Sequence, residues 1–479
     1  MKEKIVDLYI PNYFEKEIYK EAIYFEDKSN IAYIKIEDAL ELLKSIYHRY
    51  VNSDIVDYKV SGKDKLYTIH RENGSLCSID VKNNTICFDN YDSFITYSKE
   101  ELNFINDSKY LSNYEYTKGK EITISLNDYQ IKLISKDTLY IPVSLFSSIF
   151  MTYSFTNLVY NGTSLFLVMA GQMYDRTTTF NESYTLKRDK ELVNYNYNLL
   201  CLSLDFNFGL KKEKGIDTFD KYFIDIKLKN DLLEVDEKKY YDALSRLFND
   251  YLNDGHSNIV TVDQNKRFFV SNFRINRFFE SEAIRGYRRQ FNIEENRKLE
   301  IIEDTAFLTV DHLTENAYDQ LVESRSKIDD KVKNIVIDFS MCGGGFIDVT
   351  LAVLSLLLDD VSLNFYSTLT GSKARSSYHF DSLYKGFNIY CLVSNMCYSA
   401  SNLVAGVLKE SGKVKLIGEK TGGGSSAQVP ISTPLGDILK ISGTYRSSDS
   451  KEEGIIPDIV LEKAHLCDRA QILDIIRNK

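Results

Sequence analysis

The sequence predicts a two-part chain, an α+β region up to about residue 195 followed by an α/β core. Up to residue 195 the chain is rich in Tyr, Asn, Ile and Lys and has the alternation of hairpin strands, as in ITISLNDYQIKLIS at 122–135, where Asn-Asp supplies a turn. After residue 196, β-branched apolar runs alternate with apolar helical segments, which is typical of parallel strands joined by helices.

The composition is that of a globular protein with more than one core. A chain of 479 residues exceeds a typical single domain, and 43% hydrophobic with 27% charged residues is an ordinary globular balance. The net charge of −10 and the scattered lysines give no basic face, so we expect no nucleic-acid partner.

No segment has the length of a membrane span, and charged residues interrupt the N-terminus before an export signal can form, so the compartment stays open. Seven widely spaced cysteines without a CxxC pair indicate neither a disulfide framework nor a zinc site.

Two similar segments stand in the N-terminal region. AYIKIEDALELL at 32–43 and LYIPVSLFSSIF at 139–150 each show apolar alternation followed by helical spacing, as a strand entering a helix would. We therefore expect two small α+β modules, residues 1–110 and 111–195. The pattern resembles the N-terminal modules of copper amine oxidases, and a chance likeness of any strand followed by any helix is the alternative.

The second region divides into a connector, residues 196–297, and a core, residues 298–479. We expect a strand at LLCLSLDFNFGL (199–210) and a helix at 236–252, which leads into DGHS and its histidine, one of six in the chain. In the core, strands are expected within 298–313, 334–339, 387–395, 414–421 and 438–446. Helices are expected at 346–360 and 399–411, the second ending near Gly412.

A glycine-rich loop joins a strand to a helix in NIVIDFSMCGGGF, residues 334–346. Three glycines let backbone N–H groups approach an anion, which suits a phosphate or the oxyanion of acyl transfer. No lysine follows as a phosphate loop requires, so the oxyanion interpretation is preferred, and a purely structural turn is the alternative.

Ser399 opens a helix directly after a strand and a short loop. A serine in this place commonly caps the helix. The same place suits a nucleophile, because the helix N-terminus favours developing negative charge and the N–H of Ala400 can donate to an oxyanion.

Taken in order, DGHS, IDFSMCGGG, YSASN, GEKTGGGSSAQ and EEGIIPDIV resemble the carboxyl-terminal processing (tail-specific) serine peptidases. The resemblance covers roughly residues 196–465 and implies a crotonase-like (ClpP/crotonase) peptidase core. It implies a nucleophile at Ser399 and oxyanion donors at Ala400 and at Gly343 or Gly344.

The resemblance also selects a branch of the family. In the branch with a Ser-Lys dyad, the lysine follows the serine by 25 positions, and here that position is Gly424. Asn402 stands where that branch has glutamate, although Gln428 matches a glutamine it uses. The chain instead looks like the branch of tricorn core protease and interphotoreceptor retinoid-binding protein, which carries DGH[ST].

In that branch His256 is the general base, a role suited to a side chain that titrates near neutrality. The glutamate that orients it lies before the GVxPD phrase, so Glu452 or Glu453 is implied, and Glu453 is the choice. The PDZ insert common in the family has no room in the stretch of about 42 residues between His256 and Leu299.

The implied reaction is peptide hydrolysis through an acyl-enzyme, without a metal or cofactor. The expected partner is a peptide or unfolded protein, and the oligomeric state stays open. A cluster of arginines at 274–289 could attract a substrate carboxylate or be a solvated helix face. Two other functions remain as alternatives: a catalytically inactive binding protein on the same fold, and surface attachment through the N-terminal modules.

Overall fold

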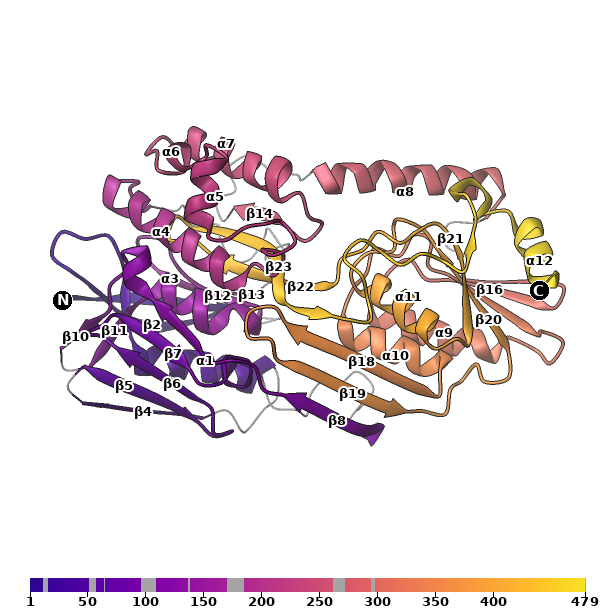
Figure 1. The fold of residues 1–479 in the computed structure, drawn as a ribbon, viewed down its shortest axis with the longest axis horizontal. Helices are drawn as coiled ribbons and strands as arrows, with labels where there is room; N and C mark the ends of the chain where they lie inside the picture. The colour runs from indigo at the N-terminus through magenta and orange to yellow at the C-terminus, as the bar shows by residue number, and fades with distance from the viewer. Residues whose placement is uncertain are drawn as a thin grey trace.

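The computed structural model describes residues 1–11, 16–50, 57–63, 65–95, 109–136, 138–169, 185–261, 272–293 and 298–478. The molecule is elongated, with the N-terminal sheets at one end and the C-terminal core at the other (Figure 1). Within the described ranges, no helix is both long and apolar enough to cross a bilayer.

The N-terminal region contains two sheets. A seven-stranded sheet has the order β10-β11-β3-β2-β1-β13-β12, and a five-stranded antiparallel sheet has the order β4-β5-β6-β7-β9. The first contains β1 (Lys2–Pro11), β2 (Lys16–Phe25), β3 (Tyr33–Lys35), β10 (Ile134–Ser135), β11 (Leu139–Pro142), β12 (Thr156–Tyr160) and β13 (Leu165–Met169). The second contains β4 (Tyr58–Lys63), β5 (Leu66–Arg71), β6 (Leu76–Asp80), β7 (Thr85–Phe88) and β9 (Ile122–Ser125).

The two similar segments lie side by side. β3 leads into α1 (Ile36–Tyr50), and β11 leads into α3 (Val143–Phe146) and a π-helical turn, Ser147–Met151. β11 pairs antiparallel with β3, with Ile141 opposite Ile34, and β13 pairs parallel with β1. The sheets therefore cross the boundary expected at residue 110, because each strand–helix unit buries its apolar face against the other in one shared core.

Two local expectations in the N-terminal part and the connector are wrong. Residues 122–135 are not a hairpin, because β9 pairs with β7 and β10 with β11, and a 3-10 turn, Leu126–Tyr129, separates them. The strand expected at 199–210 lies mostly in α4 (Lys190–Asn207), a helix buried on nearly all sides and capped by Asp189. An apolar run of this length has no periodicity that separates a buried helix from a strand.

The rest of the connector is helical and ends before the histidine motif. It contains α5 (Phe219–Asp225), α6 (Lys229–Leu232), α7 (Glu237–Arg246) and a π-helical turn, Leu247–Leu252. The Asp236 side chain caps α7 by accepting from the Lys239 N–H.

The core is a mixed α/β unit around a six-stranded sheet of order β15-β16-β17-β20-β21-β24, parallel except for the edge strand β15. Its strands are β15 (Leu299–Ile302), β16 (Thr305–Thr309), β17 (Asn334–Asp338), β20 (Asn388–Val393), β21 (Val414–Gly418) and β24 (Ile459–Val460). The helices of this half include α9 (Glu315–Ser326), α10 (Ile347–Leu357), α11 (Ala400–Glu410) and α12 (Arg469–Arg477). β17 is buried at every position, as its unbroken apolar run predicts.

A fourth sheet joins the two halves of the molecule (Figure 1). It contains β8 (Leu111–Thr117), β14 (Asn258–Thr261), β18 (Asp360–Ser367), β19 (Lys373–His379), β22 (Ser426–Ser432) and β23 (Asp437–Ser447). β22 and β23 lie within the core in sequence, between β21 and β24, yet apolar side chains such as Val429 and Ile441 belong to the N-terminal hydrophobic cluster. The long helix α8 (Asn272–Gln290) runs along the outside of the C-terminal half, from the middle of the molecule outward (Figure 1).

Candidate active site

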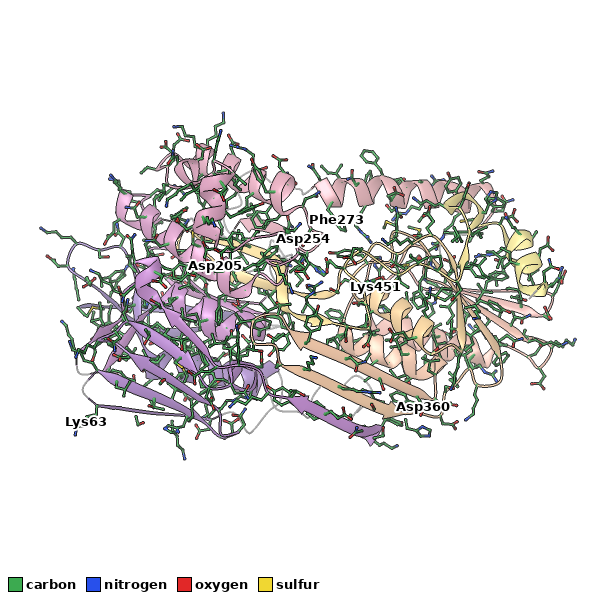
Figure 2. The ribbon with its side chains drawn as sticks, in the orientation of Figure 1. Lys63, Asp205, Asp254, Phe273, Asp360 and Lys451 are labelled. Carbon is green, nitrogen blue, oxygen red and sulfur yellow. The ribbon has the colours of Figure 1, made fainter. Side chains whose placement is uncertain are left out.

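The histidine loop follows the π-helical turn of the connector. Asn253 ends that turn in the left-handed conformation, with φ of 38°. The buried Asp254 carboxylate then folds the loop back, because its Oδ1 accepts the N–H groups of His256 at 2.9 Å and Ser257 at 3.0 Å. The Gln428 side chain donates to the His256 carbonyl at 2.7 Å, so β22 also holds the loop. Asp254 lies at the middle of the molecule, near Phe273 at the start of α8 (Figure 2).

The serine loop follows β20. Ser399 has φ of 59° and ψ of −123°, a region that non-glycine residues avoid and that is found at functional sites. The turn is held because the Ser399 N–H donates to the Gly423 carbonyl at 2.9 Å. The Ser399 side chain makes no cap hydrogen bond with its helix, so the capping role is not the one it has here.

The fold brings Ser399 and His256 together across 143 residues, with 3.0 Å between Oγ and Nε2. The pairing of β14 with β23 places the histidine, and the loop after β20 places the serine. The distance is that of a hydrogen bond between a hydroxyl and an imidazole nitrogen.

The glycine loop lies against the start of α11. Gly344 has φ of 102°, and a Cβ there would lie 2.6 Å from the Tyr398 carbonyl oxygen and 3.3 Å from the Ala400 nitrogen. Only glycine allows this approach. The loop is fixed at Gly345, which forms a bridge to Leu313. The N–H of Ala400 belongs to the first turn of α11, where backbone donors have no intrahelical acceptor.

The structure does not bring Glu453 to the histidine. The Glu453 side chain is exposed, whereas Glu452 faces inward and accepts from the Ser425 N–H at 2.9 Å and hydroxyl at 2.8 Å. The Ser442 hydroxyl lies 3.4 Å from His256 Nδ1, and that hydroxyl donates to Asp254 Oδ1 at 2.9 Å.

Burial lowers the pKa of His256 below its ordinary value. The carboxylates of Asp254 and Glu452 act in the opposite direction, and the guanidinium of Arg277 lowers the pKa further. The net direction favours a neutral imidazole, which is the form that can accept a proton.

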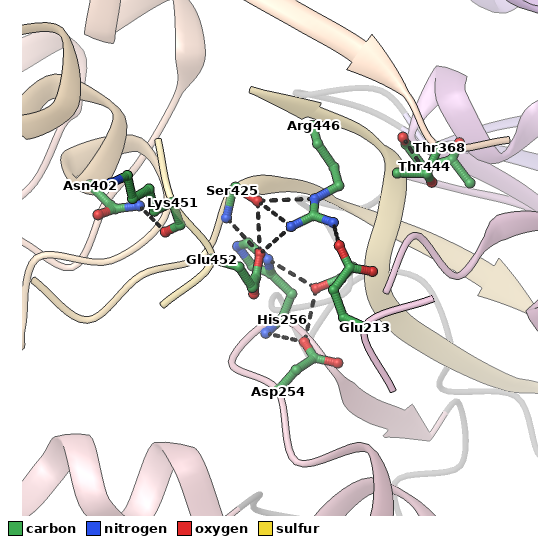
Figure 3. A network of polar contacts seen from close by, with 11 residues as sticks. Glu213, Asp254, His256, Thr368, Asn402, Ser425, Thr444, Arg446, Lys451 and Glu452 are labelled. Carbon is green, nitrogen blue, oxygen red and sulfur yellow. Dashed lines mark hydrogen bonds and ion pairs between the residues drawn. The ribbon is translucent and has the colours of Figure 1, made fainter. Parts of the chain in front are cut away.

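A second polar network lies next to the histidine (Figure 3). Arg446 donates to the Ser425 hydroxyl from Nε at 3.0 Å and Nη2 at 2.9 Å, lies 3.5 Å from Glu452 and pairs with Glu213. These contacts tie the glycine-rich segment that precedes β22 to β23, the strand that carries Ser442.

At the position where the dyad branch of the family carries its lysine, this chain has Gly424. Gly424 has φ of 80°, and a Cβ there would lie 2.6 Å from the Tyr398 ring. That ring also packs against His256, with 4.9 Å between ring centroids. Asn402 is buried and bonds to backbone and hydroxyl groups, donating to the Lys451 carbonyl at 3.0 Å and accepting from Thr421 at 2.6 Å.

Sequence reasoning missed two members of this site. Asp254 stands inside the DGHS motif. Asking which side chain accepts the backbone N–H groups of that loop would have identified it from the sequence. Ser442 has no local signal, because its place beside His256 depends on the register of β23 against β14, where Asn258 lies opposite Lys440.

The arginines of α8 do not all point into solvent. Arg277 reaches the loop before Ser399, and the buried Arg288 binds Asp311 through both Nη atoms at 3.2 and 3.1 Å. Residues 272–290 of α8 lie between the histidine loop and the core in the chain.

Comparison with known proteins gives a family match over the core. Residues 304–461 match Peptidase family S41. A carboxy-terminal-processing protease of Bartonella bacilliformis is 24% identical over 358 residues, which are 66% of this chain and 80% of the relative.

Solved structures similar to this chain include two proteases. The photosystem II D1 C-terminal processing protease has 21% identity and a TM-score of 0.30, over 33% of this chain and 42% of that one. Tricorn protease has 11% identity and a TM-score of 0.38, over 88% of this chain and 46% of that one. The chain thus spans less than half the length of either protein.

Proposed function

We propose that the chain, whose residues 304–461 match Peptidase family S41, is a serine-type peptidase that hydrolyses peptide bonds through an acyl-enzyme formed on Ser399. The observation that carries the proposal is the 3.0 Å contact between Ser399 Oγ and His256 Nε2. The reactive groups thus lie in one place although the chain separates them widely.

In the proposed reaction, neutral His256 takes the Ser399 proton as Oγ attacks the carbonyl carbon of the substrate. The imidazolium then gives that proton to the leaving amine, and the acyl-enzyme forms. In the second half His256 takes a proton from water, the resulting hydroxide attacks the ester, and Ser399 recovers its proton. The half-reactions together consume one peptide bond and one water.

The N–H of Ala400 and N–H groups of the Gly343–Gly344 pair are the proposed oxyanion donors. The close approach of Gly344 to the Ser399 turn supports this assignment. The positive end of the α11 dipole adds to the stabilisation of the negative oxygen.

We assign the orientation of His256 to Asp254 acting through Ser442, in place of Glu453. When Nε2 accepts from Ser399, Nδ1 carries the proton and faces the Ser442 hydroxyl, which in turn donates to Asp254. The carboxylate thereby stabilises the imidazolium without touching it. Glu452 adds negative charge at longer range.

The proposed core fold is crotonase-like, and the proposed substrates are peptides or unfolded proteins. The name of the Bartonella relative suggests processing at carboxyl termini as the role of the activity. The two N-terminal sheets have no assigned part in the proposed chemistry.

The proposal is tested with unfolded casein as substrate and with an active-site-directed fluorophosphonate. Wild type should cleave casein and be labelled at Ser399 alone, and Ser399→Ala should lose both while keeping its thermal unfolding transition. Unchanged cleavage by Ser399→Ala would refute the assignment of the nucleophile. A wild-type protein that neither cleaves nor labels would favour the binding-protein alternative.

A further inference from the structure

Arg277 projects from α8 onto the loop that carries Ser399. Its Nη2 donates to the Met396 carbonyl at 2.5 Å, and its Nη1 lies 3.4 Å from the Asn395 carbonyl. The guanidinium also lies over the rings of Phe273 and Tyr398, each at 5.4 Å from the ring centroid. The side chain is therefore half-buried at the edge of the proposed active site.

Arg277 differs from the other buried arginines near the site in its partners. Arg288 binds Asp311 and lies 3.5 Å from Asp338, and Arg446 lies between Glu213 and Glu452. Arg277 has no carboxylate within ion-pair distance among the residues described by the structure. Its two carbonyl contacts use two of its five N–H groups.

A charge that is half removed from water is costly unless an anion joins it. Loop carbonyls carry only partial negative charge, so they offset part of this cost. The planar fork of a guanidinium matches a carboxylate with two parallel hydrogen bonds. The open donors of Arg277 are therefore suited to a carboxylate that arrives with the substrate.

The distance between Arg277 and Ser399 limits how far the bound carboxylate can lie from the peptide bond that is cleaved. A Cβ on Gly343 would lie 3.2 Å from Arg277 Nη2, and a Cβ on the neighbouring Gly344 would lie 3.2 Å from Ser399 Cβ. Across these two glycines the guanidinium therefore lies at most about 14 Å from the Ser399 hydroxyl, which is about four residues of extended peptide.

We propose that Arg277 binds a carboxylate of the substrate within about four residues of the cleaved bond. This inference rests on the proposed peptidase function and names a substrate class for it: peptides with an anionic group close to the scissile bond. The carboxylate is either the free C-terminus of a short leaving segment or the side chain of Asp or Glu. Phe273 and Tyr398 hold the guanidinium in place by packing on it.

The test uses the full chain and peptides that it releases from denatured casein, identified by mass spectrometry. The best-cleaved peptide is synthesised in three forms: with a free C-terminus, with a C-terminal amide, and with each nearby Asp or Glu replaced by its amide. We measure kcat and KM for wild type, Arg277→Gln, Arg277→Lys and the control Arg289→Gln. Arg289 is an exposed arginine of the same helix.

Wild type should prefer one carboxylate form over its neutral counterpart by about tenfold or more in kcat/KM, chiefly through KM. The form that shows the preference identifies the source of the carboxylate. The ratio should fall to near one in Arg277→Gln, stay intermediate in Arg277→Lys and be unchanged in Arg289→Gln.

Equal cleavage of charged and neutral forms by wild type would overturn the inference, even if Arg277→Gln did not fold. So would an equal loss for all forms in Arg277→Gln, which is the result of a purely loop-supporting arginine. Failure of the proposed function has a separate signature, because then no peptide is released by wild type or release persists in Ser399→Ala.

Discussion

Replacing Gly344 by alanine tests the proposed oxyanion site at its tightest contact. The new Cβ would lie 2.6 Å from the Tyr398 carbonyl oxygen, so the loop or the serine turn must shift by more than about half an ångström to reach van der Waals contact. A positive φ of 102° adds strain of about 1–3 kcal/mol for any residue with a side chain.

A shift of this size moves an N–H donor away from the oxyanion, and loss of one such donor costs about 10²–10³-fold in kcat. We therefore expect Gly344→Ala to fold with a lower melting temperature and to lose about that factor in kcat on a casein-derived peptide. KM should change little, because the oxyanion is formed only in the transition state.

The control is Gly286→Ala in α8, where a Cβ would meet no atom within 4 Å. This variant should be as active as wild type and somewhat more stable, since alanine favours the helix. A folded Gly344→Ala enzyme with kcat within threefold of wild type would refute the oxyanion assignment, and a matching loss in Gly286→Ala would point to a general effect of substitution.

The orientation of the base gives two more predictions. Ser442→Ala should lower kcat by about 10–100-fold, because His256 loses its link to Asp254. Glu453→Gln changes an exposed side chain, so its kcat should stay near that of wild type in the same peptide assay. A large loss of kcat in Glu453→Gln with none in Ser442→Ala would restore Glu453 as the orienting group. Since only neutral His256 accepts a proton, kcat/KM should rise with pH through the pKa of His256, which burial places below its ordinary value of 6.5. Asp254 raises this pKa, so the acid limb of Asp254→Asn should move to lower pH, and a move to higher pH would contradict the assigned contact.

The contact between His256 and Ser399 could be predicted from the sequence because each residue stands in a short motif with its own physical reason. A histidine that follows Asp-Gly at a helix end and a serine that opens a helix after a strand are local features. The core strands were also predictable, since β17 and its neighbours are unbroken apolar runs between turns. The resemblance to carboxyl-terminal processing peptidases then combined these features in one order, and the family match over 304–461 confirms the resemblance for the core.

The group proposed to orient His256 was not predictable in the same way. Glu452 and Glu453 are adjacent, and the choice between them depends on which side chain faces inward, which the spacing of a motif does not determine. Ser442 lies in the middle of β23 between Ile441 and Gly443, and the role proposed for it arises only when β14 pairs with that strand. Residues 199–207 of α4 were predicted as a strand for a related reason, because this part of the helix is buried on nearly all sides and has no polar face to reveal its period.

The candidate site lies at the joint between the two halves of the molecule. For this reason β23 affects the geometry of the site, although Ser442 on this strand lies outside the sequence motifs. His256 belongs to a loop of the N-terminal half, and Ser399 belongs to the core, so neither half contains a complete pair. β23 pairs with β14 beside the histidine and with β18 of the core, and apolar residues of β22 and β23 are buried in the N-terminal cluster. The free energy gained by burying those residues also holds the imidazole within reach of the hydroxyl, so packing at the joint and catalytic geometry depend on the same strands.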